Sequence, residues 1–147
     1  MKVEIELDPA YLDPTFVIRA AELTPELSEL IRSLQSTPST SFLIGYLEER
    51  IYLIQPGDII RIYTDQKKVL VETERDTYQL KLRLYEIEEK YPIPYLVRIS
   101  NSEIVNMNKV ERLDLSLSGT ICMIFRNGKR TFVSRRYIAD IKKYLNL

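Results

Sequence analysis

The order of apolar and polar residues predicts two short strands at the start of the chain. Residues 2–7 (KVEIEL) alternate between polar and apolar side chains, which is the period of a half-buried strand. Residues 15–20 (TFVIRA) form a second short apolar run of the same kind. A helix is predicted next, because Thr24 suits an N-cap and Pro25 suits the first helical position.

The predicted helix covers residues 25–35 and is followed by a linker. The stretch 36–41 (STPSTS) has the polar, proline-containing composition of a connecting segment. We therefore expect a strand–strand–helix extension over 1–41 and a second domain over 42–147. The apolar face of the helix follows the i, i+3, i+4, i+7 spacing: Leu27, Leu30, Ile31 and Leu34.

Beyond the linker, short apolar runs separated by polar turns predict a mainly β domain with minor α content. A helix over 83–91 is stopped by Pro92. Asn127-Gly128 between two apolar arms predicts a hairpin with a type I′ turn, and a last helix begins near Ser134. The predicted strands cover 42–47, 50–55, 59–64, 68–73, 77–82, 95–99, 109–115, 120–126 and 129–133.

Composition excludes several kinds of chemistry. The chain has no histidine, so the commonest general base and the commonest metal ligand are missing. Its single cysteine, Cys122, excludes an internal disulfide and a cysteine-based zinc site, and we expect this thiol to be buried and inert on its strand. No glycine-rich phosphate loop is present. We therefore expect no enzyme activity, no catalytic residue, no metal and no cofactor.

Charge is divided unevenly along the chain, although the formal net charge is zero. Residues 1–40 contain three basic and seven acidic side chains, whereas residues 95–147 contain ten basic and four acidic ones. A basic region of this kind attracts phosphates, but similar surpluses occur in proteins that never bind nucleic acid. The N-terminus has no apolar signal segment and no apolar run is long enough to span a bilayer, so we expect a cytoplasmic protein.

Two arginines stand where a stable helix would carry acidic residues. Arg135 and Arg136 follow the N-cap candidate Ser134, and cations in a first helical turn oppose the helix dipole. Two guanidinium groups beside free N–H groups would bind a phosphate. Alternatively, one of the arginines pairs with a carboxylate elsewhere in the fold.

Two further polar clusters lie in predicted turns. Ser100, Asn101 and Ser102 end a strand, and such side chains either contact phosphates and base edges or form an Asx-type turn. Lys67 and Lys68 occupy a polar turn that is by itself typical of a solvated hairpin tip.

Taken in order, these segments resemble the LytTR DNA-binding family. The likeness lies in VRISNSEIVNMNKVERL, with its R-x-S-x-S-x-x-V-N pattern from Arg98 to Asn106, and in ICMIFRNGKRTFVSRRYIADIKKYL near the C-terminus. The upstream segment IYLIQPGDIIRIY looks like the strand–turn–strand opening of the family, so the resemblance covers 42–147. Residues 1–41 look like the extension of small free-standing members without a receiver domain.

The resemblance implies packed antiparallel sheets with short helices and no recognition helix. Loops at the sheet edges would enter successive major grooves on one face of duplex DNA and bend it somewhat. Relatives with a redox-active cysteine near the second loop differ from this chain, which has Ile99 there. The implied DNA-binding residues are Lys67 and Lys68 in the first loop, Ser100, Asn101 and Ser102 in the second, and Arg135 and Arg136 at the last helix.

The resemblance also implies partners. Direct-repeat promoter sites would hold two copies of a bacterial, response-regulator-like protein, and a small membrane protein would keep it inactive. The leucine face of the first helix either pairs the copies into a homodimer or covers a sheet of its own domain. Two alternatives remain open: a protein-interaction module of the same fold whose basic loops bind an acidic partner, and a binder of single-stranded nucleic acid that uses some of the ten tyrosines.

Overall fold

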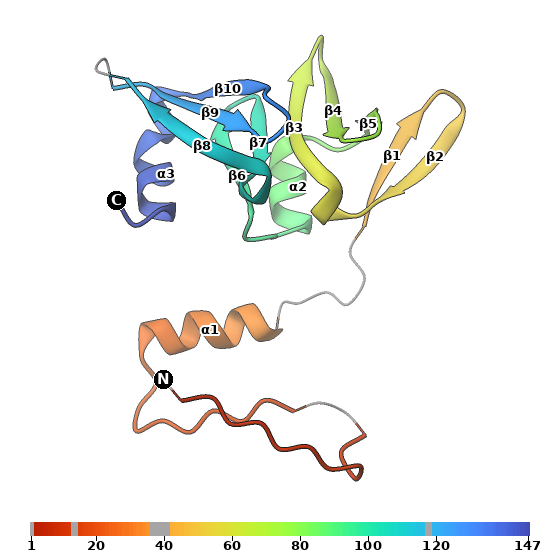
Figure 1. The fold of residues 1–147 in the computed structure, drawn as a ribbon. Helices are drawn as coiled ribbons and strands as arrows, with labels where there is room; N and C mark the ends of the chain where they lie inside the picture. Colours follow the sequence, from red (N-terminus) through yellow and green to blue (C-terminus); the bar gives the residue numbers. More distant parts are fainter. Residues whose placement is uncertain (1, 13–14, 36–41, 117–118) are drawn as a thin grey trace. The chain divides into compact units, whose positions relative to one another are not determined.

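The computed structural model describes residues 2–12, 15–35, 42–116 and 119–147. It divides into two compact units, Met1–Ser39 and Thr40–Leu147, which we describe separately (Figure 1). The linker predicted over 36–41 lies outside the described residues.

The first unit contains the predicted helix, α1 (Pro25–Gln35). The hydroxyl of Thr24 accepts a hydrogen bond from the Leu27 amide at 3.2 Å, so the predicted N-cap is confirmed. Glu26 in the first turn and Arg32 in the last turn both complement the helix dipole. These local features explain why the helix begins and ends where the sequence pattern placed it.

The two strands predicted in the first unit are wrong. Residues 2–7 and 15–20 form neither strand nor helix. The apolar side chains of the first segment remain in solvent, and Ile5 is 81% exposed. Alternation supplies one apolar face, but a strand also needs a neighbouring strand and a core against which that face can pack.

The second unit consists of two antiparallel sheets, which confirms the predicted mainly β class. The larger sheet has seven strands in the order β2-β1-β5-β4-β3-β7-β6, and the smaller has three in the order β10-β9-β8. The larger sheet is formed by β1 (Leu43–Leu47), β2 (Arg50–Ile54), β3 (Ile59–Asp65), β4 (Lys68–Thr73), β5 (Thr77–Leu80), β6 (Leu96–Ser100) and β7 (Glu103–Asn106). The smaller is formed by β8 (Val110–Leu115), β9 (Ile121–Phe125) and β10 (Arg130–Val133).

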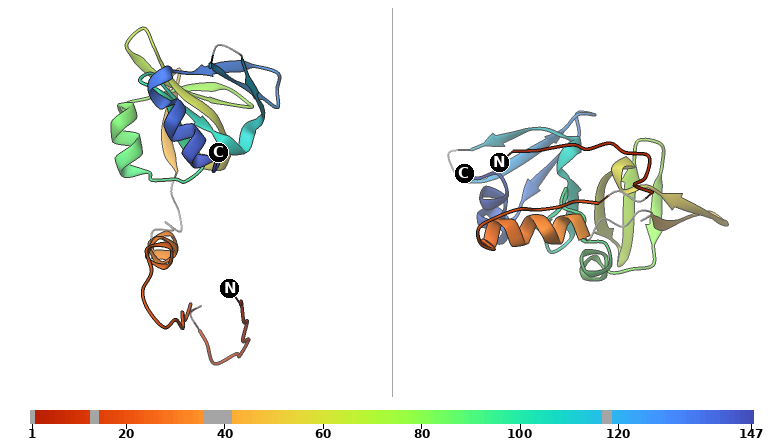
Figure 2. Two further views of the ribbon diagram at one scale, coloured as in Figure 1. Left: turned by 90° about the vertical axis from the view of Figure 1, so that its left-hand side faces the viewer. Right: turned by 90° about the horizontal axis from the view of Figure 1, so that it is seen from below.

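Each face of the larger sheet is covered over part of its width, while Ile51 and Leu53 of β2 remain exposed. On one face, α2 (Leu84–Lys90) packs Leu84 and Ile87 into a core with buried side chains of β1, β3, β4 and β7. On the other face, the smaller sheet and α3 (Ile138–Tyr144) enclose a second core (Figure 2). The consecutive residues Ile104 and Val105 of β7 belong to different cores, as the alternation of a strand requires.

Strand β7 was not predicted, although all four of its residues are buried. The segment Glu103–Asn106 lacks polar–apolar alternation because both of its faces lie inside the protein. Its buried Asn106 donates a hydrogen bond from Nδ2 to the carbonyl oxygen of Ile59 at 2.8 Å. A polar residue that looks like part of a turn thus stabilises the middle of the fold.

The hairpin predicted at Asn127-Gly128 is present, but its turn type differs. Only Gly128 has a positive φ, of 86°, and its amide donates to the carbonyl of Phe125 at 2.9 Å. A type I′ turn would require positive φ at both residues. That pattern occurs instead between β3 and β4, at Gln66 (φ 49°) and Lys67 (φ 66°).

Two smaller expectations also change. Cys122 is half-buried rather than buried, because its side chain alternates with the buried residues Ile121 and Met123 on β9. The last helix starts as a short 3-10 helix, η3 (Arg135–Tyr137), before α3, and Ser134 makes no side-chain cap. Within the described segments, no helix has the length and apolar content needed to cross a bilayer.

Candidate nucleic-acid interface

The turn between β3 and β4 forms the tip of a hairpin (Figure 1). It carries Lys67 and Lys68, which are both exposed. Asp65 and Lys68 form the last register pair of the hairpin, so Gln66 and Lys67 are its two tip residues. Both tip residues adopt the left-handed conformation, which costs a non-glycine residue about 1–2 kcal/mol. Neither lysine forms an ion pair or hydrogen bond within the described part of the chain, so both ammonium groups are available.

The turn between β6 and β7 holds Ser100, Asn101 and Ser102. The Ser100 hydroxyl accepts a hydrogen bond from the Ser102 amide at 3.2 Å, and Arg98 Nη2 donates to the Asn101 carbonyl at 2.7 Å. The Asn101 side chain does not close an Asx-type turn. Its Oδ1 accepts from the Tyr137 hydroxyl at 3.2 Å, while its Nδ2 has no partner among the described residues. An exposed amide donor is therefore held in a fixed place.

The third loop is the 3-10 helix η3, which carries Arg135 and Arg136. Both side chains are exposed, and no ion pair of either arginine occurs within residues 42–116 and 119–147. The structure therefore contradicts the alternative that one of these arginines pairs with a carboxylate. A 3-10 turn has poorer hydrogen-bond geometry than an α-helical turn, so its dipole attracts a phosphate only weakly. The two guanidinium groups are therefore the main attraction for a phosphate at this site.

Two hydrogen bonds bring the three loops together. The Thr64 amide at the end of β3 donates to the Ser102 carbonyl at 2.9 Å, and Tyr137 in η3 donates to Asn101. The Ser134 amide also donates to the Ile99 carbonyl at 2.9 Å. The turn that carries Asn101 therefore lies between the lysine turn and the arginine turn, and exposed cations flank it.

Comparisons with known proteins identify the family. The family model described as the LytTr DNA-binding domain matches residues 49–146. The chain belongs to the LytTR DNA-binding domain family. Proteins of Staphylococcus aureus strains MSSA476 and MW2, each described as an uncharacterized HTH-type transcriptional regulator, are 31% identical to it over 147 residues. The match spans 100% of this chain and 99% of each relative, so this LytTR protein is a DNA-binding transcription regulator and not an enzyme.

A solved LytTr DNA-binding domain from Bacillus cereus has the same fold. It matches with a TM-score of 0.70 and 24% identity, over 74% of this chain and 100% of that domain. The LytTR fold of this chain contains no helix-turn-helix among its described residues, because strands β6 to β10 separate α2 from α3. Its predicted DNA-contacting side chains accordingly lie in two turns and in the short 3-10 helix η3 rather than along an α-helix.

Two residues that organise the LytTR loops were not singled out from the sequence. Arg98 fastens the Asn101 turn and also pairs with Glu88 of α2. Tyr137 is the second such residue, since its hydroxyl donates to Asn101 Oδ1 and so orients the Asn101 amide. Both belong to the quoted family segments, as the first residue of R-x-S-x-S and the last of V-S-R-R-Y.

A charged cluster lies between the two sheets beneath these loops. Arg61 Nε on β3 pairs with Glu72 Oε2 on β4 at 2.8 Å, and its Nη1 lies 3.6 Å from Glu103 Oε1 on β7. Burial alone would raise the pKa of Glu72, but hydrogen bonds from Lys129 and Arg61 outweigh burial and lower it. Burial raises the pKa of Glu103, although a hydrogen bond from Thr131 and the Arg61 charge oppose the shift.

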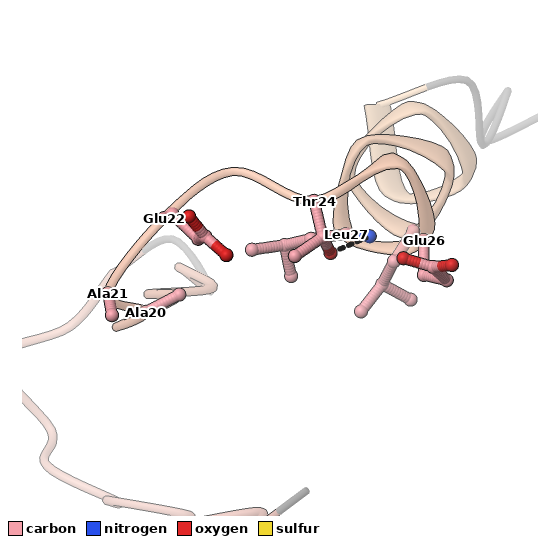
Figure 3. A pocket seen from close by; sticks show the side chains of 7 residues that line it. Ala20, Ala21, Glu22, Thr24, Glu26 and Leu27 are labelled. Atoms are coloured by element: carbon pink, nitrogen blue, oxygen red, sulfur yellow. Dashed lines mark hydrogen bonds between the residues drawn. The ribbon is translucent and has the colours of Figure 1, made fainter.

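The first unit has a different kind of surface. A groove beside the start of α1 is lined mainly by apolar side chains, including Ala20, Leu27 and Leu30, with Glu22 and Glu26 nearby (Figure 3). The lining contains no cation. The residues that match the LytTr DNA-binding domain, 49–146, lie in the second unit.

Proposed function

We propose that this regulator reads specific duplex DNA with its three loops, which enter successive major grooves on one face of the duplex. The observation that carries the proposal is the hydrogen-bonded grouping of the loops, in which Thr64 binds Ser102 and Tyr137 binds Asn101. Loops joined in this way keep their spacing when they meet a duplex. Specific recognition depends on such preorganisation, whereas mobile cations would bind any phosphate backbone.

The side chains suggest separate roles. Arg136, assisted by Arg135, contacts the two acceptors of a guanine, because a guanidinium group matches their geometry. The free amide group of Asn101 donates to a base edge or a phosphate, and Ser100 and Ser102 bind phosphates beside it. Lys67 and Lys68 bind the backbone through charge alone.

A titration with matched controls tests this assignment. Fluorescence anisotropy would compare a duplex from the upstream region of the protein's own gene with a scrambled duplex. Arg136→Ala should weaken specific binding by about 1–3 kcal/mol and relax the preference at one base pair. Arg75→Ala removes an equally exposed arginine from the β4–β5 turn and should bind as the wild type does. Equal affinity of the two variants would contradict the role of Arg136.

We also propose that two copies bind direct-repeat promoter sites and that the extension over 1–41 pairs them as a homodimer. The exposed apolar residues of the first unit and the partly exposed face of α1 support this, since such surfaces usually become buried in an assembly. Leu30→Glu should shift the full chain from dimer to monomer in sedimentation equilibrium. The matched change Glu29→Gln alters an exposed neighbour on the same helix and should not.

The proposed site of action is the cytoplasm, where promoter DNA is accessible, under the control of an inhibitory membrane protein. The family resemblance supports both statements. Co-expression with the membrane protein encoded beside the gene should move the regulator into the membrane fraction and reduce promoter binding. An acidic protein partner for the same loops is the competing function, and binding to that partner without any duplex preference would favour it.

A further inference from the structure

The segment that leads into the arginine loop is fastened to the larger sheet at several points along its length. Lys129 pairs with Glu72, and the Thr131 hydroxyl donates to Glu103 Oε1 at 3.0 Å. The Ser134 amide donates to the Ile99 carbonyl, and the Tyr137 hydroxyl donates to Asn101. Four contacts at 129, 131, 134 and 137 therefore fix β10 and η3 against the sheet that carries the other two loops.

One of these contacts depends on a residue that is costly to bury. Glu103 is 8% exposed, and its Oε2 atom has no hydrogen-bond partner among the described residues. A buried carboxylate with an unpaired oxygen loses hydration that the fold does not replace, and an apolar side chain of similar size would usually fit more favourably. The raised pKa of Glu103 reflects the same environment. A contribution to stability therefore does not explain why residue 103 is a glutamate.

The place of Glu103 suggests what it does. It directly follows Ser102 of the Asn101 turn, and it accepts a hydrogen bond from Thr131, which lies four residues before Arg135 on the neighbouring segment. We propose that Glu103 is a positioning residue for DNA reading: through Thr131 it fixes β10 against β7 and so sets how far Arg135 and Arg136 stand from Asn101. This inference rests on the proposed function of the three loops.

Amide hydrogen exchange of the full chain tests the positioning without DNA. Thr131→Val keeps the shape of the side chain but removes the donor, and Glu103→Leu removes the acceptor. Both should speed exchange of the Ser134 amide about 3- to 10-fold, because the lost contact holds β10, at whose end this amide lies, against the larger sheet. Thr120→Val is the matched control, since its hydroxyl contacts Ser116 across the connection between β8 and β9, away from the larger sheet. Unchanged exchange in both test variants would overturn the proposal.

The DNA titration tests the consequence. Affinity for the specific duplex should fall about 3- to 10-fold in Thr131→Val and in Glu103→Leu, while affinity for the scrambled duplex stays within about twofold. The double variant should bind no more weakly than Glu103→Leu alone, because the Thr131 hydroxyl has already lost its acceptor in that variant. Glu103→Gln keeps an oxygen acceptor and should restore specific binding. If Glu103 were important only for folding, the variants would instead have a lower melting temperature and a lower affinity for both duplexes.

The outcomes separate the two proposals. Specific affinity within about twofold of the wild type in both folded variants would overturn the role of Glu103. A wild-type chain without any preference for the specific duplex would contradict the proposed function instead. Exchange of the Ser134 amide would then still decide whether Glu103 holds β10.

Discussion

The two units of the chain contain apolar residues at similar spacing, but only the second unit buries them. Ile5 of the first unit is 81% exposed, whereas Ile62 of the second is completely buried between β4 and β7. The units also differ in charge, since the acidic surplus lies in the first forty residues and the basic surplus near the C-terminus. The difference shows that an apolar pattern predicts a strand only where neighbouring strands complete the sheet.

Core substitutions should give the largest contrast between the units. Ile62→Ala leaves a cavity in a closely packed core and should lower the free energy of unfolding by about 2–5 kcal/mol. Ile5→Ala removes the same atoms from an exposed position and should change it by less than about 0.5 kcal/mol. Urea unfolding followed by circular dichroism measures both. Comparable losses would show that the first unit buries Ile5 in solution.

Charge substitutions should sharpen the contrast in DNA binding. Lys67→Ala should weaken binding evenly across sequences and reduce the slope of log affinity against log salt by about one unit. Lys2→Ala in the first unit removes an exposed lysine that pairs with the neighbouring Glu4, and it should leave the slope unchanged. Titrations at several salt concentrations give both slopes. An equal reduction in the two variants would mean that the first unit also contacts phosphates.

The charged cluster should make the stability of the second unit depend on pH in two directions. The pKa of Glu72 is lower in the folded chain than in the unfolded chain. Its contribution to the free energy of unfolding is therefore present above the pKa of the unfolded chain and is lost as the pH falls through the pKa of the folded chain. The raised pKa of Glu103 means that its contribution is present at low pH and is lost as the pH rises through the folded value. In thermal melts across the acidic range, Glu72→Gln should remove the loss of stability that occurs as the pH falls. Glu103→Gln should remove the loss of stability that occurs as the pH rises. Melting curves that stay parallel to the wild type in both variants would contradict this assignment.

The two hairpin tips of the second unit should differ by a smaller amount. Replacing Gln66-Lys67 with Asn-Gly should raise the free energy of unfolding by about 1 kcal/mol, because these residues favour positive φ. Gly128→Ala should lower it by about 1 kcal/mol, since φ at that position is 86°. Chemical unfolding of both variants measures these two changes in the free energy of unfolding. A stabilised Asn-Gly variant that binds DNA less well would indicate that Lys67 is retained for function.

Much of the fold follows from the sequence because most strands have one face toward the core and one toward solvent. Their apolar and polar residues therefore alternate. The helix α1, the hairpin of β9 and β10, and the paired strands around Lys67 carry patterns that local rules interpret correctly. Strand β7 does not, since burial on both faces removes the alternation. The exchange of turn types between Gln66-Lys67 and Asn127-Gly128 is also invisible locally, because strand register decides it.

The seven candidate residues could be listed from the family motifs, but their arrangement could not. The Thr64–Ser102 and Tyr137–Asn101 hydrogen bonds join segments that are 38 and 36 residues apart in the sequence. The role of Glu103 was equally hidden, since its partner Thr131 is 28 residues away. Such contacts depend on strand pairing and on the packing of β10 and η3 against the larger sheet, which no local pattern encodes.

Hydroxyl-radical footprinting of the full chain on its own upstream duplex tests the central claim most directly. If the three loops act together, protection should fall on one face of the duplex, in two successive major grooves about 10 base pairs apart. Arg136→Ala should remove the protection in one groove and leave the other. Protection confined to a single groove, or spread around both faces of the duplex, would contradict the account.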